Sequence, residues 1–201
     1  MRPPLLIATT NLGKFAEFRE LLGSLPIDLK SLREFPGAPA VAENEATYLA
    51  NAVRKATIIA AWARCAALAD DSGLEVDALG GAPGVQSARY AGAEQDSAAN
   101  VAKLLAALRD VPPTARTARF RCVIVVAHPD GTTRGVEGTC EGQITMTPRG
   151  DAGFGYDPVF LYPPMGLTFA EMSAVAKNQV SHRAHACRQL RRQLVAFVGA
   201  A

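Results

Sequence analysis

The sequence predicts an α/β fold, because short apolar runs typical of strands alternate with stretches whose apolar residues recur at helical spacing. The run from Leu5 to Thr9 leads directly into a helix that continues through Lys14 and ends at Gly23. The sequence predicts a long strand over residues 118–127, apolar from Val123 on, and the following His128-Pro129-Asp130-Gly131 is typical of a hairpin turn. At 201 residues, the chain is long enough for one large domain, or for one domain with two lobes.

Composition and charge exclude several classes of protein. The 21 basic and 19 acidic residues leave a net charge of only +2, so no global field would attract nucleic acid or an anionic membrane. No apolar run reaches the length of a signal peptide core or of a transmembrane helix. The four cysteines lack C-x-x-C spacing, which argues against a zinc site and against redox chemistry. We therefore expect a soluble, cytoplasmic protein that binds neither nucleic acid nor membrane.

Two adjacent carboxylates, Asp70 and Asp71, follow the apolar run Ala67-Leu68-Ala69. Ser72-Gly73 is typical of a turn, so the sequence predicts that the strand ends at the aspartates and that both can serve one site. Buried carboxylates need cations, and Mg²⁺ takes one or two carboxylates beside water and phosphate oxygens. The alternative is that one aspartate caps the turn while the other is solvated.

Two further segments carry candidate phosphate and metal ligands. Thr9-Thr10-Asn11-Leu12-Gly13-Lys14 joins a strand to a helix, where backbone N–H groups, the helix dipole and a lysine favour an anion. The established phosphate-loop patterns are absent, so an ordinary helix cap with a surface lysine is the alternative. Glu43 precedes a second helix, from about Thr47 to Cys65, on which Asn51 and Lys55 share a face. Solvated side chains are the alternative for Glu43 and Lys55.

The C-terminal half carries candidate residues for a flat ligand. Glycines on both sides of Phe154 leave its ring free to stack, and Asp157 can accept hydrogen bonds nearby. The alternative is that Phe154 fills the core. His182 and Arg183 fall in the first turn of the terminal helix, where cations oppose the helix dipole. We therefore expect them to meet an electronegative group.

Seven segments, in this order, resemble the inosine/xanthosine triphosphate pyrophosphatases, which act on non-canonical purine nucleotides. The match spans nearly the whole chain, and the sequence departs from many members at Thr10 and from some at Ala50. The segments are Thr9-Thr10-Asn11-Leu12-Gly13-Lys14, Asn51-Ala52-Val53-Arg54-Lys55-Ala56, Ala69-Asp70-Asp71-Ser72-Gly73-Leu74, Gly80-Gly81-Ala82-Pro83-Gly84, Ser87-Ala88-Arg89-Tyr90, Gly153-Phe154-Gly155-Tyr156-Asp157-Pro158, and Lys177 through Ser181-His182-Arg183.

The resemblance implies a mixed α/β fold with a long curved central sheet and flanking helices. It implies one domain over residues 1–201, with two lobes around an active-site cleft, and a homodimer. It also implies hydrolysis of ITP, dITP and XTP to the monophosphate and pyrophosphate, with Mg²⁺ as cofactor.

The same resemblance assigns roles to individual residues. Glu43, Asp70 and Asp71 would hold the metal, with Asp71 as the general base that activates water. The implied substrate-binding residues are Thr9, Thr10, Asn11, Leu12, Gly13, Lys14, Lys55, Ser72, Phe154, Gly155, Tyr156, Asp157, Lys177, Ser181, His182 and Arg183. Among these, Lys14, Lys55 and Lys177 would cradle the triphosphate.

Base selection is expected from the same set of residues. Phe154 would stack on the purine, while His182 and Arg183 would donate hydrogen bonds to the 6-oxo group that adenine lacks. Two alternatives remain open: a pyrophosphatase for modified pyrimidine nucleotides, and a nucleotide-binding module without catalysis.

Overall fold

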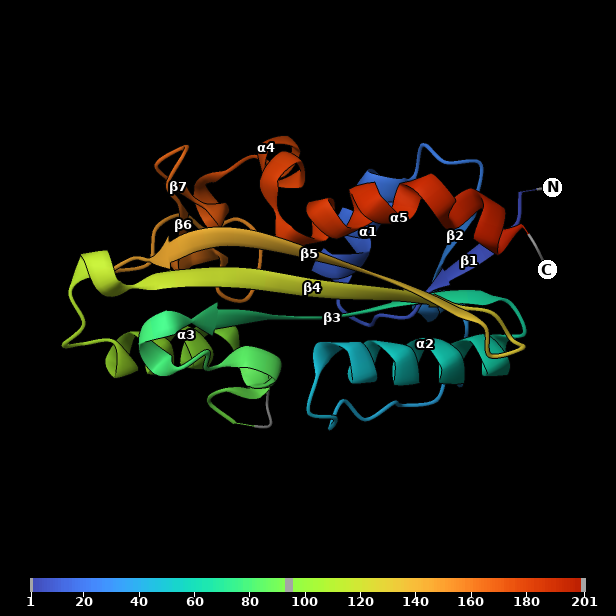
Figure 1. Ribbon diagram of the computed structural model, residues 1–201, viewed down its shortest axis with the longest axis horizontal. Coiled ribbons are helices and arrows are strands. Elements are labelled where there is room, and N and C mark those ends of the chain that lie inside the picture. The colour runs from blue at the N-terminus through green and yellow to red at the C-terminus, as the bar shows by residue number, and fades with distance from the viewer. Residues whose placement is uncertain (1, 93–95, 200–201) are drawn as a thin grey trace. The chain divides into compact units, whose positions relative to one another are not determined.

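The computed structural model describes residues 2–92 and 96–199 (Figure 1). Within these ranges, seven strands form one sheet in the order β2-β1-β3-β4-β5-β6-β7. The strands are β1 Pro4–Ile7, β2 Asp28–Ser31, β3 Ala66–Val76, β4 Thr117–Ala127, β5 Thr133–Ile144, β6 Phe160–Tyr162 and β7 Leu167–Thr168. β1 pairs in parallel with β2 and β3, whereas β6 pairs antiparallel with β5 and β7. The predicted mixed α/β fold is therefore confirmed.

The helices of the described chain begin where the sequence offers caps. They are α1 Leu12–Leu22, α2 Tyr48–Ala63, α3 Ser97–Ala107, α4 Ala174–Val180 and α5 His182–Val198. Asn11 caps α1 by accepting a hydrogen bond from the Lys14 amide, and Asp96 caps α3 in the same way. Helix α4 was not predicted, because seven residues carry too little periodicity to indicate a helix.

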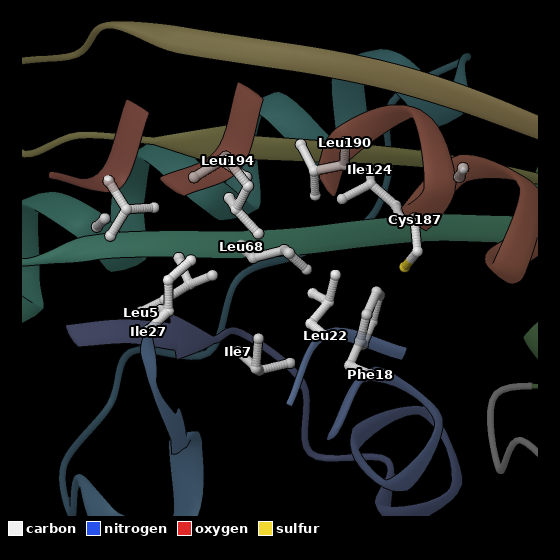
Figure 2. Close-up of a cluster of buried hydrophobic side chains, with 14 of the residues drawn as sticks. Leu5, Ile7, Phe18, Leu22, Ile27, Leu68, Ile124, Cys187, Leu190 and Leu194 are labelled. Carbon is white, nitrogen blue, oxygen red and sulfur yellow. The ribbon is translucent and has the colours of Figure 1, made fainter. Parts of the chain in front are cut away.

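The first of two compact units contains the described residues up to Asp71, Cys122–Gly138 and those from Arg183 on. Its main apolar core lies between the sheet and helices α1 and α5 (Figure 2). The fully buried members of this core include Leu5, Ile7, Phe18, Leu22, Leu68, Ile124, Cys187, Leu190 and Leu194. Helix α2 lies on the other side of the sheet from α5 (Figure 1). Within this unit the two faces of β3 therefore meet different helices.

The second unit contains Ser72–Arg121 and Thr139–His182. Its core joins β3 and α3 to an aromatic cluster in which the Phe120 and Phe160 ring centroids are 4.6 Å apart, and those of Phe160 and Phe169 4.8 Å. Arg116 is fully buried and donates hydrogen bonds to the carbonyls of Leu108, Val111 and Thr145 at 2.6, 2.9 and 3.1 Å. These bonds tie the end of α3 to the end of β5.

The prediction that the strand ends at Asp70-Asp71 is wrong. β3 continues without interruption from Ala66 to Val76, so Ser72 and Gly73 lie inside the strand. Pairing and burial in the sheet outweigh the local turn preference of a Ser-Gly pair. Because successive side chains of a strand alternate between faces, Asp70 and Asp71 point to different sides of the sheet. No helix among the described residues has the length and apolar character needed to cross a membrane.

Candidate functional site

Asp70 is buried in β3 and is held by two cations of the first unit. Lys14 Nζ lies 3.0 Å from Asp70 Oδ2, and an Arg183 Nη atom donates to the same oxygen at 2.8 Å. Burial by itself would raise the pKa of Asp70, but the charges of Lys14, Arg183 and Lys55 outweigh it and hold that pKa below its ordinary value. Asp70 is therefore an ionised carboxylate with its charge balanced inside the protein.

Arg183 completes this cluster from the start of α5. Its other Nη atom donates to Glu17 Oε2 at 2.5 Å, and its side chain is 1% exposed. Burial would lower the pKa of Arg183, but the carboxylates of Asp70 and Glu17 raise it well above its ordinary value. The expected electronegative partner of Arg183 thus consists of two carboxylates. Glu17 was not among the predicted site residues, and its place one turn after Lys14 on α1 is the feature of the sequence that could have indicated it.

Asp71 faces the opposite side and meets α2. The Asn51 Nδ2 atom donates to Asp71 Oδ2 at 2.8 Å, while Asn51 Oδ1 accepts from the Glu45 amide at 3.0 Å. Burial raises the pKa of Asp71, and the charges of Glu43 and Asp70 raise it further against the opposing effects of Asn51 and Lys14. Asp71 is therefore an oriented carboxylate with increased affinity for a proton. Asn51 was not among the predicted site residues. Its helix face was predicted to be that of Lys55, which was a predicted site residue.

Glu43 and Lys55 form a hydrogen-bonded ion pair beside α2. Across the described ranges, no three His, Cys, Asp or Glu side chains are grouped so that they could hold a metal ion. The proposed ligands Glu43, Asp70 and Asp71 are not assembled as a group of three, because the alternation of β3 turns Asp70 toward Lys14 and Arg183. A metal-binding role for these carboxylates stays a prediction.

The turn from Thr9 to Lys14 is arranged as a helix cap. Thr9 Oγ1 accepts from the Asn11 amide at 3.2 Å, and Asn11 Oδ1 accepts from the Lys14 amide at 3.0 Å. Thr10 and Leu12 are exposed, Gly13 is partly buried, and Ser72 in β3 is also partly buried. The capping alternative is correct for Asn11, and it leaves the start of α1 open to an anion.

Phe154, Asp157 and Lys177 form a compact cluster in the second unit. Lys177 Nζ lies 2.6 Å from Asp157 Oδ2, and the same oxygen accepts from the Phe154 amide at 2.9 Å. Lys177 Nζ also lies 4.9 Å from the centroid of the Phe154 ring, within the range of a cation–π contact. Gly153 has φ +79°, and a Cβ atom there would lie 2.1 Å from Asp157 Oδ2. This loop therefore requires glycine at position 153.

For Phe154 the structure goes against the core-filling alternative, and for Lys177 it shows contacts that were not predicted. Phe154 is only partly buried, so it does not fill the core. Lys177 was predicted with the triphosphate-binding lysines, but within this unit it contacts two predicted base-binding residues, Phe154 and Asp157.

Three of the remaining predicted residues of the second unit, Tyr156, Ser181 and His182, are buried. The His182 ring stacks on Phe120, with centroids 4.7 Å apart and planes 14° apart. Ser181 is fully buried and ends α4, where its amide donates to the Lys177 carbonyl at 2.9 Å. Tyr156 is 4% exposed, and burial raises the pKa of its hydroxyl. Gly155 precedes it with φ +62°.

The fold and these side-chain clusters define the class of the protein: a mixed α/β protein in which strand β3 carries two buried acids, one of them paired with lysine and arginine. The chain belongs to the Ham1 family, whose model matches residues 5–193.

Named relatives and solved structures support this assignment. The chain is 51% identical to a dITP/XTP pyrophosphatase of Geobacillus kaustophilus over 97% of this chain and 96% of the relative. It is 45% identical to a Bacillus subtilis dITP/XTP pyrophosphatase, over 95% and 96% of the two chains. The solved HAM1 protein of Coxiella burnetii matches with a TM-score of 0.87 and 39% identity, over 98% of this chain and all of that chain. The Staphylococcus aureus Ham1 protein matches with a TM-score of 0.84 and 38% identity, over 96% of this chain and 99% of that chain.

Proposed function

We propose that this protein hydrolyses the non-canonical purine nucleoside triphosphates ITP, dITP and XTP to the monophosphate and pyrophosphate. The observation that carries the proposal is the placement of Asp71, a buried carboxylate that a hydrogen bond from Asn51 orients. The relatives named dITP/XTP pyrophosphatase supply the substrate class. The resemblance also implies a homodimer, and the lack of a targeting or membrane segment in the sequence favours a cytoplasmic location. The near-neutral charge argues against nucleic acid as a partner.

Asp71 would act as the general base that takes a proton from the attacking water. A general base works best when its pKa approaches the working pH, and burial moves Asp71 in that direction. Asn51 holds one carboxylate oxygen by a hydrogen bond of 2.8 Å, which fixes the orientation of the Asp71 carboxylate. Asp70, by contrast, is bound to Lys14 and Arg183 and has a lowered pKa, so it is a poor candidate for this step.

The carboxylates of Glu43 and Asp71 fit Mg²⁺, which takes one or two carboxylates and completes its coordination with water and phosphate oxygens. The effect of the Glu43 charge on the pKa of Asp71 supports their acting together. When bound, Mg²⁺ would neutralise phosphate charge and polarise a phosphoryl oxygen. The ion pairs of Asp70 weigh against its predicted role as a third ligand. Lys14 and Lys55 would offset the remaining charge of the triphosphate.

Phe154 would bind the purine, as the resemblance implies. Phe154 offers a partly exposed ring for stacking, and the Asp157–Lys177 pair fixes the loop that carries it. His182 and Arg183 would donate to the 6-oxo group, which adenine replaces with an amino donor. For that role, Arg183 would have to release Glu17 or Asp70 when the nucleotide binds.

The proposal is tested by steady-state hydrolysis of ITP, dITP, XTP, GTP and ATP, with and without Mg²⁺, with pyrophosphate and orthophosphate measured separately. We expect pyrophosphate release from ITP, dITP and XTP only when Mg²⁺ is present, and a kcat/KM for ATP lower by up to about 10⁴-fold. Faster hydrolysis of modified pyrimidine nucleotides would favour the first alternative. Nucleotide binding without any pyrophosphate release would favour the non-catalytic module.

A further inference from the structure

Ser87 anchors a short helical turn, Gly84–Arg89, to strand β3 inside the second unit. The Ser87 hydroxyl oxygen accepts a hydrogen bond from the Leu74 amide at 2.8 Å and donates to the Gly84 carbonyl at 2.6 Å. Ser87 is 6% exposed, so these bonds form away from solvent. The main chain at Ser87 is therefore fixed relative to β3.

The Ser87 carbonyl in turn holds the loop of Phe154. The Tyr156 hydroxyl donates to the Ser87 carbonyl oxygen at 2.8 Å, and this bond is buried. At its other end, the Tyr156 carbonyl accepts from the amides of Val159 and Phe160 at 3.0 and 3.1 Å. The side chain and main chain of Tyr156 are thus both fixed, and Phe154 lies only two residues before it.

Packing alone leaves one side of this loop unsupported. A pocket of about 660 Å³ lies between α3 and the loop, bordered by Val101, Leu105, Pro148, Phe154 and Pro158. Side chains beside such a space lose the contacts that would hold them in one orientation. Hydrogen bonds to fixed groups therefore contribute more to the placement of the loop than they would in a filled core.

Asn100 of α3 holds the same turn from a second direction. Its Nδ2 atom donates to the Ala88 carbonyl at 3.0 Å, and its Oδ1 atom accepts from the Ala91 amide at 2.6 Å. Asn100 is 4% exposed. The acceptor of the Tyr156 hydroxyl is consequently a rigid group.

We infer that Ser87 and Tyr156 are positioning residues for the nucleobase: the buried chain from the Leu74 amide through Ser87 to the Tyr156 hydroxyl sets the place of Phe154. This inference rests on the proposed function, in which Phe154 stacks on the purine. It changes the predicted role of Tyr156, which would act through Phe154 and without contact to the substrate.

The test compares Tyr156→Phe with wild type in steady-state hydrolysis of ITP. We expect KM to rise about fivefold, which corresponds to one buried hydrogen bond, while kcat stays within about twofold. Tyr162→Phe is the matched control, because it removes a hydroxyl from a tyrosine packed on the same apolar cluster but outside the link. We expect its KM to equal that of wild type.

A second variant keeps the test independent of any loss of folding. Ser87→Ala retains Tyr156 and removes the contact to Leu74, and we expect it to raise KM as well. If the two residues act through one link, the double variant raises KM by clearly less than the product of the single effects. A wild-type KM in both single variants, or single effects that simply multiply, would overturn the link. Failure of the wild-type protein to release pyrophosphate from ITP would instead overturn the proposed function.

Discussion

Asp70 and Asp71 are neighbours in sequence, yet the two faces of β3 give them opposite electrostatic environments. On one face Lys14 and Arg183 hold Asp70 ionised, and on the other burial and Glu43 raise the pKa of Asp71. The difference arises because β3 continues through the pair and alternates its side chains. An acidic pair within a strand can therefore divide its tasks, with one carboxylate stabilising the fold and the other available for chemistry.

The largest effect should come from Asp71→Asn. The amide cannot accept the proton of water, so we expect kcat for ITP to fall by about 10³-fold or more. Pyrophosphate release measures the loss, while nucleotide binding and the thermal midpoint serve as controls and should change little. Near-normal turnover in this variant would mean that Asp71 is not the general base. The two aspartates would then not differ in catalytic role.

The second effect concerns stability, and here Asp70 should matter more than Asp71. Asp70→Asn leaves Lys14 and Arg183 without their shared carboxylate, so we expect the free energy of unfolding to fall by about 3 kcal/mol. Asp71→Asn should change it by less than about 1 kcal/mol, because the folded protein already disfavours that charge. Denaturant unfolding at neutral pH measures both. Equal losses in the two variants would mean that the faces do not differ in the way described.

A third test extends the comparison to lysine pairs in the two units. Lys177→Met leaves Asp157 buried and unbalanced, so we expect a loss of about 2 kcal/mol in the free energy of unfolding. Lys55→Met should cost less than about 1 kcal/mol, since the Glu43 side chain is 33% exposed and water can solvate it. If both variants lost the same stability, burial would not be the variable that separates these pairs.

The smallest effect concerns Asp77. Like Asp70, it forms an ion pair with an arginine, but it is exposed to solvent. Hydrogen bonds from Thr117 and Arg119 lower the pKa of Asp77. A lowered pKa means that the unfolded chain binds the proton more readily, so this contribution is present above the ordinary pKa and is lost as pH falls through the folded value. We expect the free energy of unfolding of wild type to exceed that of Asp77→Asn by less than about 1 kcal/mol at pH 7.

Unfolding measured between pH 7 and pH 3 should show this margin shrinking as the solution becomes acidic. A margin that stayed constant over that range would assign it to something other than the charge of Asp77. The same unfolding measurements on Asp70→Asn give the pH dependence for a buried aspartate.

Local sequence predicted much of the fold and several site residues. The helix that follows Leu5–Thr9 and the cap at its start are short-range features, so neighbouring residues predict them. Ser72-Gly73 was misread because the sheet overrides a local turn preference. Glu17 and Asn51 were not predicted as site residues for a related reason. An acid or amide on a helix meets its partner only through tertiary packing.

The sequence by itself determined the residue types of the site: its acids and lysines, the glycine-flanked Phe154 and the terminal His182-Arg183 pair. It did so because motif order and helical or strand periodicity depend on covalent neighbours. Only the tertiary structure decided which cation meets which carboxylate, that Lys177 binds Asp157 beside Phe154, and that Asp70 and Asp71 have different partners. Those pairings and the pKa shifts that accompany them depend on burial and on distances between segments far apart in the chain.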